Sequence, residues 1–183
     1  MRLFVAVTPP VDALDELRAA TAAARSAHPD LRWTRPDQWH LTLAFLGDVG
    51  DDARADVAVR LGRTAARHAP LELALRGAGR FGERVLWTRV DGDLAGLRGL
   101  AASVRAAARK ARIAVEDRPY RPHLTLARGR DGADLRPLVD ALAGFAGRRW
   151  TATEVHLVRS RLGAGPDRTA RYEPVTSWPL TGS

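Results

Sequence analysis

The tetrapeptide His-Leu-Thr-Leu occurs twice in the chain, at residues 40–43 and 123–126, although the chain holds only five histidines. In a β-strand, alternate side chains project to the same face, so a histidine and the threonine two residues later lie side by side. His40 and Thr42 are therefore predicted to share one face, with the leucines buried behind them, and so are His123 and Thr125. The repeat thus predicts two similar strands that bring two imidazoles and two hydroxyls to one cleft.

The remaining pattern predicts an α+β protein. Each half has apolar residues at helical spacing, then a proline-containing approach, then its motif strand, which indicates an ancient duplication. We therefore expect a single domain over residues 1–183, bilobal, with two pseudo-symmetric lobes and mostly antiparallel sheets around a central groove. The expected helices are 11–27, 51–68, 93–112 and 134–145; the expected strands are 2–7, 71–76, 84–90, 150–162, 172–180 and the two motif strands; and 163–171 is expected to be a mobile loop.

Composition limits the function classes. The chain has 183 residues, no cysteine and a formal net charge of +8, carried almost entirely by arginine because Lys110 is the only lysine. Disulfides and thiolate metal sites are thereby excluded. No apolar run approaches the length of a membrane span, and the first residues read as a strand rather than a signal peptide, so we expect a cytoplasmic protein without membrane contact. The arginines favour a phosphate-rich partner such as RNA, although a genomic bias toward arginine explains them equally well.

Two His-x-Thr pairs suit phosphodiester chemistry. Histidine titrates near neutral pH, so one imidazole can take a proton from water while the other, as imidazolium, protonates a leaving oxygen. The threonine hydroxyls can donate hydrogen bonds to the non-bridging oxygens, where charge develops in the transition state. We expect no metal and no cofactor, because a zinc site needs a third or fourth protein ligand and no such motif occurs. His28, His68 and His156 are expected to be solvated, capping or structural.

Longer segments around both motifs resemble the RNA 2′,3′-cyclic phosphodiesterases of the LigT-like, two-histidine phosphoesterase superfamily. The resemblance spans almost the whole chain, and it is carried by Arg2–Val7, Trp33–Gly47, Arg118–Arg128, Leu157–Gly163 and Arg171–Glu173. It implies a bilobal fold with a central groove and metal-independent hydrolysis of terminal 2′,3′-cyclic phosphates to 2′-phosphates. It further implies that His40 is the general acid, that His123 is the general base, and that Thr42 and Thr125 hold the phosphate oxygens.

Several neighbouring residues are further candidates for substrate binding. Arg128, five residues after His123, is placed to contact phosphate or base, and Phe45 stands at the same distance from His40. Phe4 on the first strand is a second candidate for stacking a base, although both phenylalanines equally suit a core. Tyr120, with Arg121, precedes the second motif and is expected to shape the groove wall. Trp39 is either core or groove lining, where it would narrow the rim.

Three alternatives remain open at this point. RNA ends or small cyclic nucleotides are the expected partners of a monomer, but relatives in the superfamily open 2′,5′-linked oligoadenylates or ADP-ribose cyclic phosphates, and the catalytic pair cannot separate these substrates. The reverse reaction, which joins RNA ends through a 2′,5′ linkage, is chemically possible. An RNA- or nucleotide-binding module that has lost catalysis is the alternative from another class, and the two intact motifs argue against it.

Overall fold

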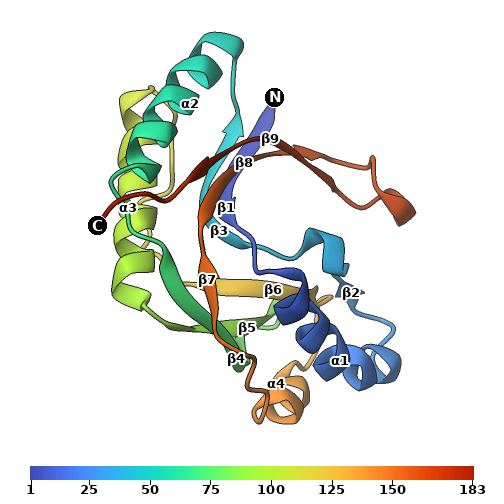
Figure 1. Cartoon of the computed structure of the whole chain (residues 1–183). Coiled ribbons are helices and arrows are strands. Elements are labelled where there is room, and N and C mark those ends of the chain that lie inside the picture. The colour runs from blue at the N-terminus through green and yellow to red at the C-terminus, as the bar shows by residue number, and fades with distance from the viewer.

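The structure, a computed structural model, describes all residues from 1 to 183 and contains two antiparallel sheets. The first sheet has the strand order β3-β1-β8-β9 (Figure 1). Its strands are β1 (Arg2–Val7), β3 (Leu41–Asp48), β8 (Glu154–Arg161) and β9 (Arg171–Pro179). β1 therefore lies inside the sheet although it begins the chain, and β8 and β9 form a hairpin at one edge.

The second sheet has the order β2-β6-β5-β4-β7 and carries the second motif on β6. A two-residue strand, β2, pairs with the end of β6, so residues that precede the first motif also hold the second motif's strand in place. The strands are β2 (Arg32–Trp33), β4 (Leu71–Phe81), β5 (Val85–Gly92), β6 (His123–Arg128) and β7 (Trp150–Ala152).

Four α-helices and two short 3₁₀ helices complete the fold. α2 and α3 pack against each other along one side of the molecule, whereas α1 and α4 lie together at the end near β4 (Figure 1). The Asp93 carboxylate caps α3 by accepting a hydrogen bond from the Gly96 amide at 2.8 Å, which satisfies one of the unpaired N–H groups of the first turn. The helices are α1 (Val11–Ala27), η1 (Pro36–Gln38), α2 (Asp51–Ala65), α3 (Leu94–Lys110), α4 (Arg136–Leu142) and η2 (Pro166–Arg168).

One cluster of 39 buried residues joins both sheets to the helices. It includes all four leucines of the motifs, Leu41, Leu43, Leu124 and Leu126, none more than 1% exposed. The burial of these leucines confirms the predicted alternation, and their apolar area anchors both motif strands at the centre of the molecule. The histidines and threonines are consequently directed away from the core.

The predicted α+β class with antiparallel sheets is confirmed, but several elements differ in their bounds. The strand expected over 71–76 continues to Phe81 as β4, and the helix expected over 51–68 ends at Ala65. The helix expected over 134–145 is shorter: it begins with Pro137 in its first turn, where the missing N–H costs nothing, and it ends before Gly144. The strand expected over 150–162 is divided at Thr153 into β7 and β8, which belong to different sheets.

The segment 163–171, expected to be a mobile loop, contains η2 and is held by hydrogen bonds to the residues around η1. Its anchors lie far away in the chain, so its glycines and proline alone could not reveal them. One domain with two pseudo-symmetric lobes stays a prediction.

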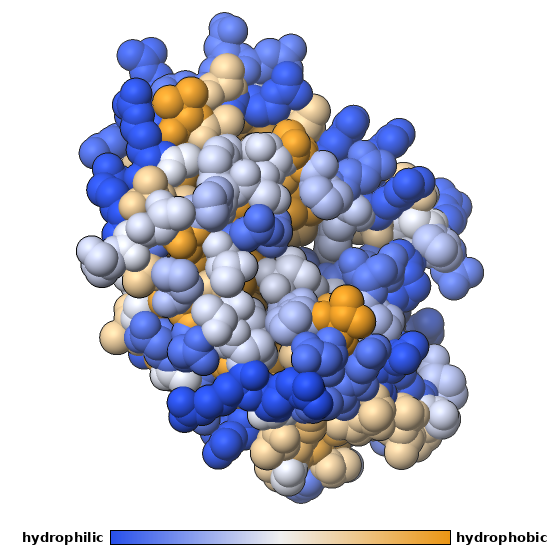
Figure 2. Space-filling model, viewed as in Figure 1, coloured by the Kyte–Doolittle hydropathy of each residue, from blue (hydrophilic) through white to orange (hydrophobic).

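The surface is mainly hydrophilic on the face shown in Figure 2, with a hollow beside the projecting β8–β9 hairpin. None of the helices is both long enough and apolar enough to cross a membrane.

Candidate active site

Both motifs open into one pocket of about 170 Å³, called here the central pocket. It brings together His40, Thr42, His123 and Thr125, the four residues that the repeat predicts, although the two motifs lie 83 positions apart in the chain. Arg128 and Phe45, two of the further candidates, also line it. The other lining residues are Thr34, Gln38, Phe81, Val85 and Tyr172.

A β-bulge follows the threonine in each motif strand. In β3 the register with β1 passes from Thr42 directly to Ala44, and in β6 the register with β5 passes from Thr125 directly to Ala127. The last leucine of each motif is thus the extra residue. A bulge changes which side chains share a face, and it explains how the residue five positions after each histidine lines the same pocket as the threonine.

The backbone fixes the protonation pattern of both imidazoles. The Nδ1 atom of His40 lies 2.7 Å from the carbonyl oxygen of Gln38, and Nδ1 of His123 lies 2.7 Å from that of Arg121. A carbonyl oxygen can only accept, so Nδ1 carries the proton and donates in both rings. In the neutral state each Nε2 is left as a proton acceptor. The Nε2 atom of His40 is 2.9 Å from the Thr42 hydroxyl, which therefore donates to it.

Aromatic rings enclose His40. The ring centroid of Phe4 is 4.6 Å from that of His40, and Tyr172 meets the same imidazole edge-on at 5.4 Å. Burial lowers the pKa of His40 to about 4; the hydrogen bond to the Gln38 carbonyl opposes this shift, and the nearby charge of His123 adds to it. The free protein therefore holds His40 neutral at pH 7.

His123 has a similar but less enclosed environment. Phe81 meets its ring edge-on at 4.9 Å, and Trp87 lies 6.3 Å away. Burial lowers the pKa of His123, the hydrogen bond to the Arg121 carbonyl raises it, and the positive charge of Arg128 lowers it further. An anion bound between the two imidazoles would oppose these shifts and favour the protonated form of either ring.

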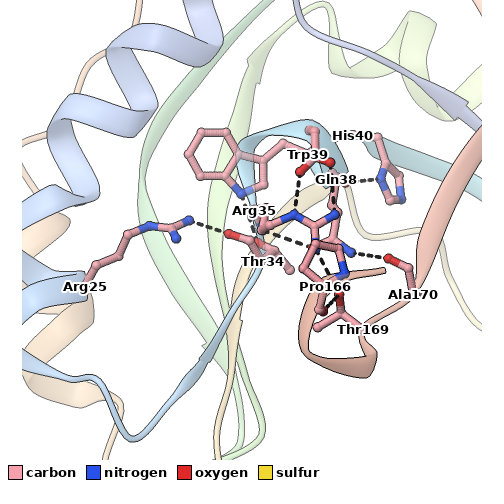
Figure 3. A network of polar contacts seen from close by, with 10 residues as sticks. Arg25, Thr34, Arg35, Gln38, Trp39, His40, Pro166, Thr169 and Ala170 are labelled. Atoms are coloured by element: carbon pink, nitrogen blue, oxygen red, sulfur yellow. Dashed lines mark hydrogen bonds and ion pairs between the residues drawn. The ribbon is translucent and has the colours of Figure 1, made fainter. Parts of the chain in front are cut away.

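A polar network behind His40 joins η1 to the β8–β9 hairpin (Figure 3). The Gln38 side chain takes part at both of its ends. Its Nε2 atom donates to the Ala170 carbonyl at 2.7 Å, and its Oε1 atom accepts from the backbone N–H of Arg35 at 3.0 Å. The Arg35 guanidinium donates to the Thr169 hydroxyl at 2.9 Å. Because the Gln38 carbonyl also accepts from His40, this network links the orientation of His40 to the position of the hairpin.

A second contact links the segment before the first motif to the strand of the second motif. The Thr34 hydroxyl lies 2.8 Å from the Thr125 carbonyl oxygen, to which it donates, and it accepts a hydrogen bond from the Trp39 indole at 2.9 Å. Trp39 is only 2% exposed, so it belongs to the core and does not narrow a rim. Arg25 packs against the Trp39 ring and donates to the Thr34 carbonyl.

The remaining candidates lie around the central pocket rather than in it. Phe4 is 3% exposed and packs behind His40, so it supports the imidazole instead of offering a free face for a base. Tyr120 lines a neighbouring pocket with Arg121, as expected of a groove wall, and its hydroxyl is buried. Sequence reasoning missed Phe81, Tyr172 and Gln38, because nothing in their local pattern shows that the fold carries them to the histidines.

No group of three or more histidine, aspartate or glutamate side chains is arranged to hold a metal ion. His68 is hydrogen-bonded to Ser103, whose hydroxyl lies 2.9 Å from its Nε2, and takes no part in the central pocket. His156 lies beside His40 in a separate pocket of about 370 Å³, with its Nδ1 atom 2.7 Å from the Ser177 hydroxyl.

Comparisons with known proteins agree on one family. The family model described as the 2'-5' RNA ligase superfamily matches residues 3–164. A protein of Escherichia coli K12 named RNA 2′,3′-cyclic phosphodiesterase is 33% identical, with 98% of this chain and 97% of that protein covered. A protein of the same name from Geobacillus stearothermophilus is 31% identical, and the match covers 98% of this chain but 57% of the length of that relative.

Solved structures show the same fold. The crystal structure of TT0787 from Thermus thermophilus superposes with a TM-score of 0.80 at 31% identity, covering 100% of both chains. The crystal structure of Escherichia coli LigT in its apo form gives a TM-score of 0.77 at 28% identity, covering 98% of this chain and 97% of that one.

Proposed function

This chain belongs to the 2'-5' RNA ligase superfamily, and from that premise we propose that it hydrolyses RNA-terminal or nucleoside 2′,3′-cyclic phosphates to 2′-phosphates. The observation that carries the proposal is the central pocket, in which two imidazoles with the same backbone hydrogen bond face two threonine hydroxyls and Arg128. Relatives named RNA 2′,3′-cyclic phosphodiesterase support the choice of substrate.

The reaction requires one proton to be removed from the attacking water and another to be donated to the leaving 3′ oxygen. In the proposed mechanism Nε2 of His123 accepts a proton from water, and the water oxygen attacks phosphorus. The bond from phosphorus to the 3′ oxygen breaks, and protonated His40 delivers its Nε2 proton to that oxygen. The products are a 2′-phosphate and a free 3′ hydroxyl, and the proton gained by His123 is later exchanged with solvent. No metal takes part in this mechanism.

The other polar groups of the pocket stabilise the phosphate. Thr42 and Thr125 donate hydrogen bonds to its non-bridging oxygens, and the Arg128 guanidinium contributes positive charge. The Thr42 hydroxyl, which donates to His40 in the free protein, changes partner when the phosphate enters. The negative charge of the substrate favours the protonated form of His40, which is neutral in the free protein at pH 7.

The test is hydrolysis of an oligonucleotide ending in a 2′,3′-cyclic phosphate, with a metal chelator present and with the 2′- and 3′-phosphate products resolved. Wild type should form the 2′-phosphate, and His40→Ala and His123→Ala should each lose roughly 10²–10⁴-fold in rate. His28→Ala, which changes a histidine outside the central pocket, is the matched control.

Formation of the 3′-phosphate, or activity that chelation removes and a divalent metal restores, would contradict the mechanism. A folded wild-type protein without turnover on this substrate would direct the search to 2′,5′-linked or other cyclic substrates. Binding without turnover on all of them would favour the binding-module alternative.

A further inference from the structure

A larger pocket, of about 460 Å³, adjoins the central pocket beside His123. The two share four lining residues, Thr42, Phe45, Phe81 and His123. Ligand pockets for small molecules span roughly 300–1,000 Å³, so the central pocket alone is small for a nucleotide. A nucleotide whose phosphate lies between the histidines must therefore extend beyond the central pocket.

Three arginines line this larger pocket, called here the arginine pocket: Arg105 from α3, and Arg118 and Arg121 from the segment between α3 and β6. Arg105 donates to the Arg118 carbonyl at 2.7 Å, and its guanidinium carbon lies 5.6 Å from the centre of the Tyr120 ring. The guanidinium carbon of Arg121 lies 5.9 Å from the centre of the Phe81 ring. These contacts with backbone and aromatic rings orient the guanidinium groups of Arg105 and Arg121 without neutralising them.

Carboxylates are scarce in the arginine pocket. Glu116 is the only acidic residue that lines it, and it pairs with Arg118 at 3.3 Å. The two side chains are 61% and 82% exposed, so the pair is weak and a phosphate can replace the carboxylate. Neither Arg105 nor Arg121 forms an ion pair with a carboxylate. The pocket is thus arranged to receive an anion, and arginine binds phosphate through two parallel hydrogen bonds.

A cyclic mononucleotide cannot supply that anion. A nucleoside 2′,3′-cyclic phosphate has a single phosphate, and the proposed reaction places it at the histidines. The next anion along an RNA strand is the phosphodiester on the 5′ side of the terminal nucleotide. Phe45, which is 60% exposed, and Phe81 border both pockets and offer aromatic faces to the bases between the two phosphates.

We propose that the arginine pocket binds the phosphodiester that precedes the terminal nucleotide, so that the preferred substrate is an RNA strand rather than a free cyclic mononucleotide. This inference rests on the proposed function, because it places the terminal cyclic phosphate at the histidines.

A third pocket, of about 260 Å³, continues the same surface and shares Phe81, Tyr120 and Arg121 with the arginine pocket. It adds Arg80 and Arg98, and no carboxylate lines it. The positive surface therefore extends past the arginine pocket, in keeping with a strand rather than a single phosphate.

The experiment compares three substrates: adenosine 2′,3′-cyclic phosphate, the same nucleotide with a 5′-phosphate, and the dinucleotide UpA ending in a 2′,3′-cyclic phosphate. For wild type, kcat/KM should be about tenfold higher for the dinucleotide than for the unphosphorylated mononucleotide, as expected for one added charge-assisted hydrogen bond. In Arg121→Gln, which keeps the backbone carbonyl that accepts from His123, this ratio should fall toward one. Arg149→Gln removes an equal charge from an exposed position outside the pockets and should keep the wild-type ratio.

Salt dependence gives a second readout. For the dinucleotide, the slope of log(kcat/KM) against log[salt] should be smaller by about 0.7 in Arg121→Gln, the change expected when one phosphate contact to a single strand is lost. An equal gain for the dinucleotide and for the 5′-phosphorylated mononucleotide would assign the preference to the phosphate, as proposed.

A wild-type ratio near one, a ratio that survives in Arg121→Gln, or a gain seen only with the 5′-phosphorylated mononucleotide would overturn the proposal. If wild type hydrolysed none of the three, the proposed function would fail. The subsite would then be tested by calorimetry, which should show tighter binding of UpA 2′-phosphate than of adenosine 2′-phosphate, with the difference lost in Arg121→Gln. Equal affinities would refute it.

Discussion

Burial of His40 should make the stability of this protein depend on pH in the range where an ordinary histidine titrates. The ring is enclosed by Phe4 and Tyr172, and burial lowers its pKa to about 4. In the unfolded chain its pKa is about 6.5. The unfolded state therefore binds a proton at a pH where the folded state does not, so the free energy of unfolding decreases as the pH falls from about 6.5 toward 4.

The magnitude follows from the difference between the two pKa values. One pKa unit corresponds to about 1.4 kcal/mol, so the full contribution is about 3 kcal/mol. At pH 5.0 most of it has been lost, and linkage gives a decrease of about 2 kcal/mol relative to pH 7.5. This is a large fraction of the stability of an ordinary domain.

The measurement is urea unfolding of wild type and of His40→Gln at pH 7.5 and at pH 5.0. Glutamine does not titrate, and both proteins share all other ionisable groups, so the difference between their pH dependences isolates His40. Wild type should lose about 2 kcal/mol more than the variant between the two pH values, with unchanged m-values. Equal losses in the two proteins would show that His40 is not desolvated and would refute the reasoning.

Three further predictions concern the groups around the histidines. Because both histidine pKa values are lowered in the free protein, the bell-shaped pH profile of kcat/KM should have its optimum below pH 6.5. The profile of kcat, which reports the enzyme with substrate bound, should have its optimum at a higher pH because the negative charge of the substrate raises these pKa values. Coincident optima for kcat/KM and kcat would contradict this expectation. Arg128→Gln should raise the pKa of His123, measured by NMR titration of the imidazole, and weaken binding of inorganic phosphate about tenfold by calorimetry. Gln38→Ala should lower the free energy of unfolding by about 1–3 kcal/mol, because the backbone N–H of Arg35 and the Ala170 carbonyl lose their hydrogen-bond partner. Amide hydrogen exchange should become faster only in η1 and in the loop of the β8–β9 hairpin.

Much of the site could be predicted from sequence because its central signal is local. The two histidines and two threonines follow from an exact repeat and the two-residue period of a strand, and the burial of the motif leucines confirms that period. The helices and most strands follow equally from apolar spacing and from proline and glycine. The α+β class could be inferred from these elements together with the resemblance.

The contacts that complete the pocket could not be predicted, because they depend on tertiary structure. Phe81 comes from the end of β4 and Tyr172 from β9, and both reach the histidines only through sheet pairing. The role of Phe4 is ambiguous in the sequence for a related reason: a phenylalanine on an inner strand suits a core and a groove equally, and only the packing around His40 places it behind the ring. Trp39 is resolved in the same way, by its hydrogen bond to Thr34.

The two bulges bear on the acid and base roles proposed for the two histidines. Each bulge falls on the last leucine of its motif, so both copies direct the residue five positions after the histidine into the pocket. At that matched position one copy has Phe45 and the other has Arg128. An aromatic ring at one matched position and a guanidinium at the other make the two halves of the pocket chemically different, although the backbone hydrogen bonds of the two imidazoles are the same. A symmetric pair would offer no reason for one histidine to give a proton and the other to take it. The Arg128 charge lowers the pKa of His123 and favours the neutral form that the proposed general base requires, whereas burial makes His40 neutral in the free protein, so its proposed role as the acid depends on the charge of the bound phosphate.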